Sequence, residues 1–299
     1  MMQIFKKPNI NFIELRKKFF MISGALVLIA VLSLAIRGLN LGLDFTGGTL
    51  MQVRFEKFIS TGDLRSALNK GGVEAAIQSF SDSDSFQIKV KGPQTDVNAE
   101  ANKISKAIKD NVPENNFSVD KLDYVGPIVG KDLSRKALFA IVLSMCGIIL
   151  YVAFRFSNPI WGGCGVIALF HDVMIALGAL SLTGREIDLV VVAALLTIVG
   201  YSINDTVVIF DRMRENMRNF PKMGLGELIN VSLNETLSRT IITSITVFLV
   251  VLILFLFGGD VINNFAFTML IGTICGTYST IAIAVPLVYA WANAGKGKK

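Results

Sequence analysis

Six apolar runs, each about as long as a lipid bilayer is thick, constrain this chain more than any other feature. The hydrocarbon core of a membrane is roughly 30 Å thick, so a helix needs about 20 apolar residues to cross it. Four of the runs carry no charged residue, and two are interrupted by acidic groups. We therefore predict an α-helical polytopic membrane protein with six transmembrane helices, at residues 19–36, 137–154, 159–182, 187–210, 240–259 and 265–291.

The composition agrees with lipid-facing surface. Hydrophobic residues make up 52% of the 299 positions and charged residues only 17%, which is too apolar for a soluble domain. The net charge of +6 comes from basic residues that cluster beside the apolar runs, without interleaved aromatic residues. We therefore interpret the charge as a topology signal and expect no nucleic-acid partner.

The basic residues predict the orientation in the membrane. Alternate connections between the runs are rich in Lys and Arg, whereas residues 183–186 and 260–264 contain a single Arg185. Positive residues stay inside, so residues 1–18 and the tail 292–299 are predicted to be cytoplasmic and residues 37–136 to be exported. The residues behind this prediction are Lys6, Lys7, Arg16, Lys17, Lys18, Arg155, Arg212, Arg214, Arg218, Lys222, Lys296, Lys298 and Lys299.

A rival interpretation makes residues 1–35 a cleaved signal peptide, because Ser33 and Ala35 resemble a small-residue cleavage site. The apolar stretch there is about 18 residues long, and signal peptides usually have roughly 7–15. This length favours a retained span.

The exported segment between the first two spans is the one predicted soluble domain. Alternating residues predict strands at 49–57, 73–80, 86–90 and 117–125, and helical spacing predicts helices at 61–69 and 95–110. This β-α-β-β-α-β order is typical of a small α+β ferredoxin-like domain. Such a fold hosts many functions, so we expect a binding or contact domain.

The segment LGLDFTGGT at 41–49 precedes the first of these strands. Its glycines favour a tight turn over a ligand-contacting role, and it is not a dinucleotide fingerprint because a strand follows it. The exported segment contains no Ser/His/Asp set, no metal-ligand cluster and no phosphate loop. The whole chain has one histidine, and its three cysteines lie in apolar runs. We expect no enzyme activity, no cofactor and no metal.

Ionisable groups inside the predicted membrane region are the strongest functional candidates, because charge in hydrocarbon costs roughly 2.5 kcal/mol or more. Asp205 lies in the fourth span, and His171 and Asp172 lie in the third. Arg239 opens the fifth span in the same cytoplasmic half of the bilayer as Asp205. Helical spacing places a further polar set with the acid on one stripe that can face the bundle interior: Thr197, Tyr201, Asn204 and Asp205.

Two interpretations of these groups remain open from residue chemistry. In the first, Asp205 and Arg239 form a satisfied ion pair, and His171 and Asp172 hydrogen-bond to neighbouring helices. In the second, the carboxylate takes up and releases protons as the helices move, which would convert a proton gradient into motion.

Four segments carry a resemblance to a known family. The sequence resembles the SecF family of bacterial protein translocase subunits from the first span to the last. The matching segments are LGLDFTGGT (41–49), FHDV (170–173), VGYSINDTVVIFDRMREN (199–216) and LNETLSRT (233–240).

The resemblance implies an accessory subunit of the Sec translocase in the bacterial inner membrane, related to the resistance-nodulation-division exporters. It implies that SecD, the SecYEG channel and the exported polypeptide are partners, besides the lipid bilayer. It implies that the proton motive force, or sodium as in some relatives, drives late steps of export. It also implies roles in proton conduction for Asp205 and Arg239, and we add Asp172, His171, Asn204 and Tyr201 as relay candidates.

The sequence leaves two other functions open. A small-molecule secondary transporter of the resistance-nodulation-division kind is the main alternative, although six spans are only half such a unit. A purely structural membrane scaffold is the other.

Overall fold

The computed structural model describes residues 8–80, 84–92, 97–156 and 158–294. Lys6, Lys7, Thr95, Lys296, Lys298 and Lys299, on which parts of the predictions rest, lie outside these residues. Within them, six helices are long and apolar enough to cross a membrane, which confirms the predicted number. They are α1 (Phe12–Arg37), α5 (Pro127–Arg155), α6 (Pro159–Thr183), α7 (Leu189–Asn219), α8 (Leu225–Phe257), and a last helix built from α9 (Asp260–Ser279), the π-helical segment η1 (Thr280–Ala284) and α10 (Val285–Ala294).

Several of these helices extend beyond the apolar runs that predicted them. α8 begins at Leu225, well before residue 240, because Leu228, Ile229 and Leu233 give its polar first half a buried apolar face. α5 begins at Pro127, whose fixed φ suits the first helical position. The apolar runs therefore mark the lipid-crossing parts of longer helices.

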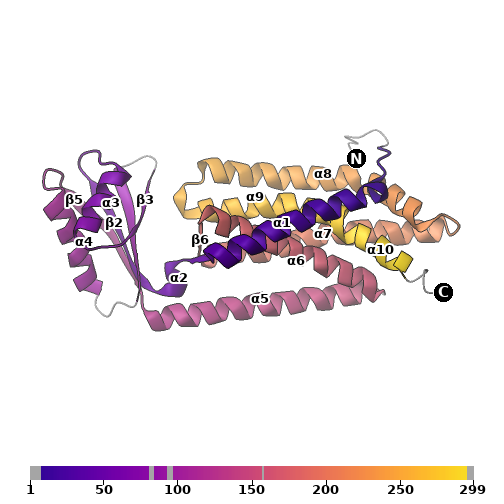
Figure 1. Cartoon of the computed structure of the whole chain (residues 1–299), viewed down its shortest axis with the longest axis horizontal. Coiled ribbons are helices and arrows are strands. Elements are labelled where there is room, and N and C mark those ends of the chain that lie inside the picture. The colour runs from indigo at the N-terminus through magenta and orange to yellow at the C-terminus, as the bar shows by residue number, and fades with distance from the viewer. Residues whose placement is uncertain (1–7, 81–83, 93–96, 157, 295–299) are drawn as a thin grey trace.

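The six helices pack as one elongated bundle, with the sheet-containing domain at one end (Figure 1). In α6, α7 and the last helix more than half of the residues in the most apolar stretch are buried, whereas in α5, which runs along the outside, few are. Glycines permit the close packing at the centre. A Cβ on Gly272 of α9 would lie 2.2 Å from the side chain of Ile198 on α7, and one on Gly276 would lie 3.0 Å from Ser202. These two glycines therefore let the last helix pack closely against α7.

The domain between the first two membrane helices contains the six elements in the predicted order. They are β2 (Gly48–Phe55), α3 (Thr61–Lys70), β3 (Ala76–Ser79), β4 (Ser85–Lys91), α4 (Val97–Asn111) and β5 (Phe117–Val125). The strands form an antiparallel sheet in the order β3-β4-β2-β5. Alternate sheet residues such as Met51, Val53 and Ile88 pack against Leu64 of α3 and Ile104 of α4 in a closed apolar core.

A short parallel ladder joins the exported segment to the membrane bundle. β1 (Asn40–Leu41) pairs with β6 (Glu186–Ile187) in the connection between α6 and α7. The next residues form one helical turn, α2 (Leu43–Thr46), before strand β2. Gly47 and Gly48 follow with φ values of 72° and 142°, which side chains rarely adopt. The predicted tight turn is therefore a helical turn closed by two glycines.

Candidate functional site in the membrane bundle

A buried polar cluster lies where α6, α7 and the last helix meet. Asp172 of α6 lies at the centre of this cluster and is fully buried. Its Oδ1 lies 3.0 Å from Nδ1 of His171, and its Oδ2 accepts hydrogen bonds from Ser202 Oγ at 2.6 Å and Ser279 Oγ at 2.7 Å. One carboxylate thus holds three helices together. The first of the two interpretations expected hydrogen bonds from Asp172 to neighbouring helices, and the structure contains them. His171 Nε2, by contrast, is buried without a partner.

A π-helical turn begins directly after Ser279 and brings a second hydroxyl into the same region. Thr280 Oγ1 lies 3.0 Å from Thr206 Oγ1 of α7. In a regular α-helix two successive side chains point about 100° apart. The wider π-turn reduces this angle, which helps Ser279 and Thr280 face the same neighbouring helices. Single π-turns inside α-helices occur frequently at functional sites.

Asp205 lies about one turn after Ser202 on α7 and has a different environment from that of Asp172. The residue is only 4% exposed, and its Oδ2 is buried without a hydrogen-bond partner. An ionised carboxylate buried without partners is costly, so this site favours either the protonated form or a partner that comes and goes. Asp205 therefore has the environment expected of a proton-exchanging group, whereas Asp172 has that of a structural one.

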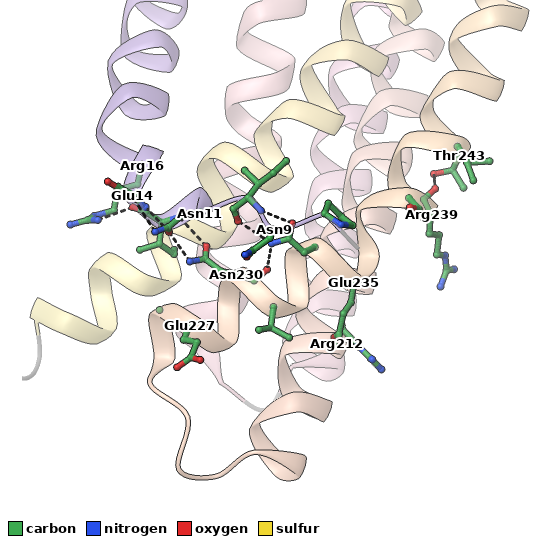
Figure 2. Close-up of a pocket in the computed structure, with 18 residues that line it drawn as sticks. Asn9, Asn11, Glu14, Arg16, Arg212, Glu227, Asn230, Glu235, Arg239 and Thr243 are labelled. Carbon is green, nitrogen blue, oxygen red and sulfur yellow. Dashed lines mark hydrogen bonds and ion pairs between the residues drawn. The ribbon is translucent and has the colours of Figure 1, made fainter. Parts of the chain in front are cut away.

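Arg239 does not pair directly with Asp205. Among the residues that the structure describes, no ion pair within 4.0 Å joins them, although the charge of Arg239 still acts on the Asp205 carboxylate over a longer distance. Arg239 is exposed and borders a cavity of about 1390 Å³ beside the first half of α8. Figure 2 shows its side chain directed outward from α8, apart from the asparagines near the chain's first described residues. The satisfied ion pair considered from the sequence is therefore absent.

The predicted polar stripe on α7 divides between two faces, so its prediction was wrong in part. Asp205 and the hydroxyl of Tyr201 are buried, and the hydroxyl has no partner there. Thr197 and Asn204 are exposed on the outside of the chain. Seven residues make almost two full turns, so Thr197 and Asn204 share a face, while Asp205 lies about 100° further round.

Sequence reasoning missed the hydroxyls of Ser202 and Ser279, which bind Asp172. Ser202 lies inside the predicted GYSINDT segment, and its spacing of three from Asp205 could have placed it on the same face. No sequence signal marked Ser279 and Thr280, because the π-turn that orients them has no known composition. In the part of the chain that the structure describes, no three His, Cys, Asp or Glu side chains gather as a metal site would require.

Comparison with known proteins decides the family. The family model for the C-terminal part of the protein export membrane proteins SecD and SecF matches residues 103–294, and the model for the SecD/SecF GG motif matches residues 32–57. This chain belongs to the SecD/SecF family. The second match covers the glycine segment that links the exported sheet to α7, and the first covers both buried aspartates.

Relatives within the family align over nearly the whole chain. The protein translocase subunit SecF of Endomicrobium trichonymphae is 42% identical over 97% of this chain and 94% of its own length. The subunit SecF of Calditerrivibrio nitroreducens is 45% identical over 94% of this chain and 93% of its own length. The SecF of Escherichia coli O157:H7 is 41% identical over 90% of this chain and 83% of its own.

Two solved structures share the fold. The crystal structure of SecDF from Thermus thermophilus, described as a translocon-associated membrane protein, superposes with a TM-score of 0.83 at 36% identity. A super-membrane-facing form of SecDF gives a TM-score of 0.73 at 35% identity. They match 96% and 100% of this chain, but this chain spans only 39% and 40% of theirs.

Proposed function

We propose that this chain is an accessory subunit of the Sec protein translocase, which uses the proton motive force to promote late steps of polypeptide export across the bacterial inner membrane. The observation that carries the proposal is Asp205, a carboxylate that is 4% exposed and has no hydrogen-bond partner on Oδ2. Such a group can change its protonation when Arg239 or water approaches, and each change alters the forces between α7 and α8. Protons are the proposed driving ion, with sodium as the alternative.

The proposed partner within the membrane is SecD, and the support is an uncovered polar face. Thr197, Gly200 and Asn204 recur at helical spacing along α7 and are exposed on this chain alone. Polar groups and small residues on a membrane helix are typical of surfaces that pack against another helix rather than lipid. The SecDF chains, of which this chain spans about two fifths, offer further membrane segments for this face. SecYEG and the exported polypeptide are proposed as the further partners.

We also infer the topology and the domain class. The first turn of α1 and the end of α10 lie at the end of the bundle away from the sheet (Figure 1). Together with the excess of basic residues at that end, this supports cytoplasmic termini and an exported sheet domain. The strand order β3-β4-β2-β5, with α3 and α4 packed on one side, supports a ferredoxin-like fold for that domain.

The test is Asp205→Asn in vesicles that carry the complete translocase. We expect assembly with SecD to be unchanged and export stimulated by a proton gradient to fall to the level without a gradient. Glu215→Gln is the matched control on the same helix, because Glu215 is exposed and a glutamine oxygen can keep the contact that Glu215 Oε2 makes with Arg212 Nη1 at 2.6 Å. Gradient-stimulated export that survives Asp205→Asn would refute the proposal.

The two alternative functions predict different outcomes. A resistance-nodulation-division type of small-molecule transporter would move a solute that depends on Asp205 and would confer drug resistance. A scaffold would tolerate the joint neutralisation of Asp205, Asp172 and Arg239 in export assays. The export assay, a drug-sensitivity assay and the triple variant therefore separate the three functions.

A further inference from the structure

We propose that Asp44 is a positioning residue that fixes the outer end of α7 to the exported domain, so that this domain and the helix carrying Asp205 move as one body. The inference rests on the function proposed above and adds the mechanical connection that such a function needs. It assigns a task to the glycine segment 41–49, which the membrane site itself does not use.

The first contact is a helix cap supplied from a distant part of the chain. The first N–H groups of a helix lack partners within it. Asp188 Oδ1 accepts from the Val191 N–H, which is an ordinary local cap. Asp44 Oδ2 accepts from the Leu189 N–H at 3.0 Å, although the two residues are 145 positions apart. The negative charge of Asp44 also lies at the positive end of the helix dipole.

The second contact is made by the backbone. The Gly42 N–H donates to the Ile187 carbonyl at 2.7 Å, next to the ladder that pairs Leu41 with Ile187. A Cβ on Gly42 would lie 3.0 Å from that carbonyl oxygen, so any side chain there would require the α6–α7 connection to shift by a few tenths of an ångström. The two connections therefore behave as one small sheet with shared hydrogen bonds.

The third contact is an ion pair that reaches into the exported sheet. Glu186 Oε2 lies 2.6 Å from Lys89 Nζ of β4, and its Oε1 lies 3.5 Å from Lys91 Nζ. The side chains of Glu186 and Lys89 are only 14% and 18% exposed, so water screens this pair less than an ordinary surface pair. Lys91 also donates to Asn40 Oδ1 and to the Leu41 carbonyl. We call the set formed by residues 40–44, residues 186–189, Lys89 and Lys91 the joint.

The joint gives α7 a fixed point outside the membrane. From Leu189 to Asp205 the helix is continuous, a length of about 24 Å at 1.5 Å per residue. A continuous helix of this length moves nearly as a rigid rod when it shifts by the height of one or two helical turns. A shift of α7 caused by a change at Asp205 would therefore reach the exported domain through Asp44 and Glu186, provided that the joint stays closed.

Hydrogen exchange on the purified full-length chain, combined with the export assay, tests the cap. Asp44→Ala removes the acceptor, whereas Asp44→Asn keeps an oxygen that can accept from the Leu189 N–H. We expect Asp44→Ala to speed amide exchange at residues 187–190 about fivefold, the factor given by a cap of typical strength, and to reduce gradient-stimulated export. Asp44→Asn should resemble the wild type in both measurements.

Two results would overturn the inference. One is wild-type export by Asp44→Ala despite faster exchange, which would reduce the joint to an ordinary fold contact. The other is an Asp44→Asn variant as defective as Asp44→Ala. Asp205→Asn serves as a reference in the same assays: the exchange at residues 187–190 should stay at the wild-type rate even if the proton role of Asp205 proves wrong. Failure of the joint and failure of the proposed function are therefore distinguishable.

A disulfide tests whether the joint stays closed during export. Leu41 and Ile187 are direct partners in the parallel ladder, where neighbouring strands lie about 4.8 Å apart, which suits a disulfide. In a background without the native cysteines, Leu41→Cys with Ile187→Cys should cross-link and still export at the wild-type rate. Each single variant is the control. Loss of export that a reductant restores would show that the joint has to open, which would overturn the one-body inference.

Discussion

Asp172→Ala and Asp205→Ala remove the same atoms from two buried positions in neighbouring helices, so their comparison isolates what surrounds each carboxylate. Asp172 has contacts with His171, Ser202 and Ser279, at 3.0, 2.6 and 2.7 Å. Asp205 has an oxygen buried without any hydrogen-bond partner. We therefore expect the first truncation to destabilise the bundle strongly and the second to leave its stability nearly unchanged.

The magnitudes follow from the number of contacts. Hydrogen bonds between membrane helices contribute about 0.6 kcal/mol on average and up to roughly 1.7 kcal/mol, so the two interhelical contacts of Asp172, with Ser202 and Ser279, amount to about 1–3 kcal/mol. For Asp205→Ala no such contact to the unpaired oxygen is lost, and the cost of holding a bare carboxylate in the interior is relieved. We expect a loss of less than about 1 kcal/mol or a gain in the free energy of unfolding.

Unfolding in mixed micelles by increasing fractions of dodecyl sulfate, followed by tryptophan fluorescence, provides the measurement. Asp172→Asn is the matched control, because its amide can accept from Ser202 and Ser279 and should recover most of the loss. Equal losses for the two alanine variants would refute the distinction between a structural Asp172 and an exchanging Asp205. A larger loss at Asp205 would show that its carboxylate has a stabilising partner.

Two further variants test the packing and the cytoplasmic end. Gly178→Ala should lower the free energy of unfolding by about 1–3 kcal/mol in the same micelle assay, because its Cβ would lie 2.3 Å from the Cβ of Ala30 on α1; Gly163→Ala, with open space around the site, should be neutral. Asn234→Ala should speed amide exchange at residues 10–13 and cost about 1 kcal/mol, because Asn234 bonds both the N–H and the carbonyl of Ile10, at 3.0 and 2.9 Å. Unchanged exchange in that variant would show that other contacts hold the start of α1.

The membrane helices were predictable because the length and the apolar composition of a continuous run of residues are enough to select them. A run of apolar residues as long as the bilayer is thick has few alternatives, so each predicted span falls on one of the six helices and extends beyond that helix by two residues at most. The exported strands and helices followed from alternation and helical spacing in the same way. The extension of α8 to Leu225 escaped the prediction because its first half is amphipathic rather than apolar.

The site was predictable in its acids and not in their partners. Asp172, Asp205 and Arg239 stood out because charge is rare inside apolar runs, but the side-chain distances depend on how helices rotate against each other. Rotation exposes Asn204 and buries Ser202, two residues apart on α7. Helical spacing gave the relative angles on α7 correctly, but without the packing it could not say which face is internal. The role of Asp44 as a cap depends on a contact 145 residues away, which no local pattern encodes.

The contacts divide the bundle into a firmly joined part and a less firmly joined one. Asp172 connects α6, α7 and α9 through hydroxyls, and the joint connects α7 to the exported domain. At the level of Asp205, by contrast, the described residues include no hydrogen bond or ion pair between this carboxylate and α8, and Arg239 acts on it only through space. Nearer the connection between α7 and α8 the two helices are joined, because Arg212 and Asn216 of α7 bond to Glu235 of α8 at 2.7 and 2.8 Å. A change of charge at Asp205 therefore meets the least polar resistance from α7 in the part of α8 beyond Glu235. We expect this part of α8 to shift relative to α7, and spin labels beside Asp205 on α7 and beside Arg239 on α8 should report a distance change between Asp205 and Asp205→Asn forms that labels on α6 and α7 do not.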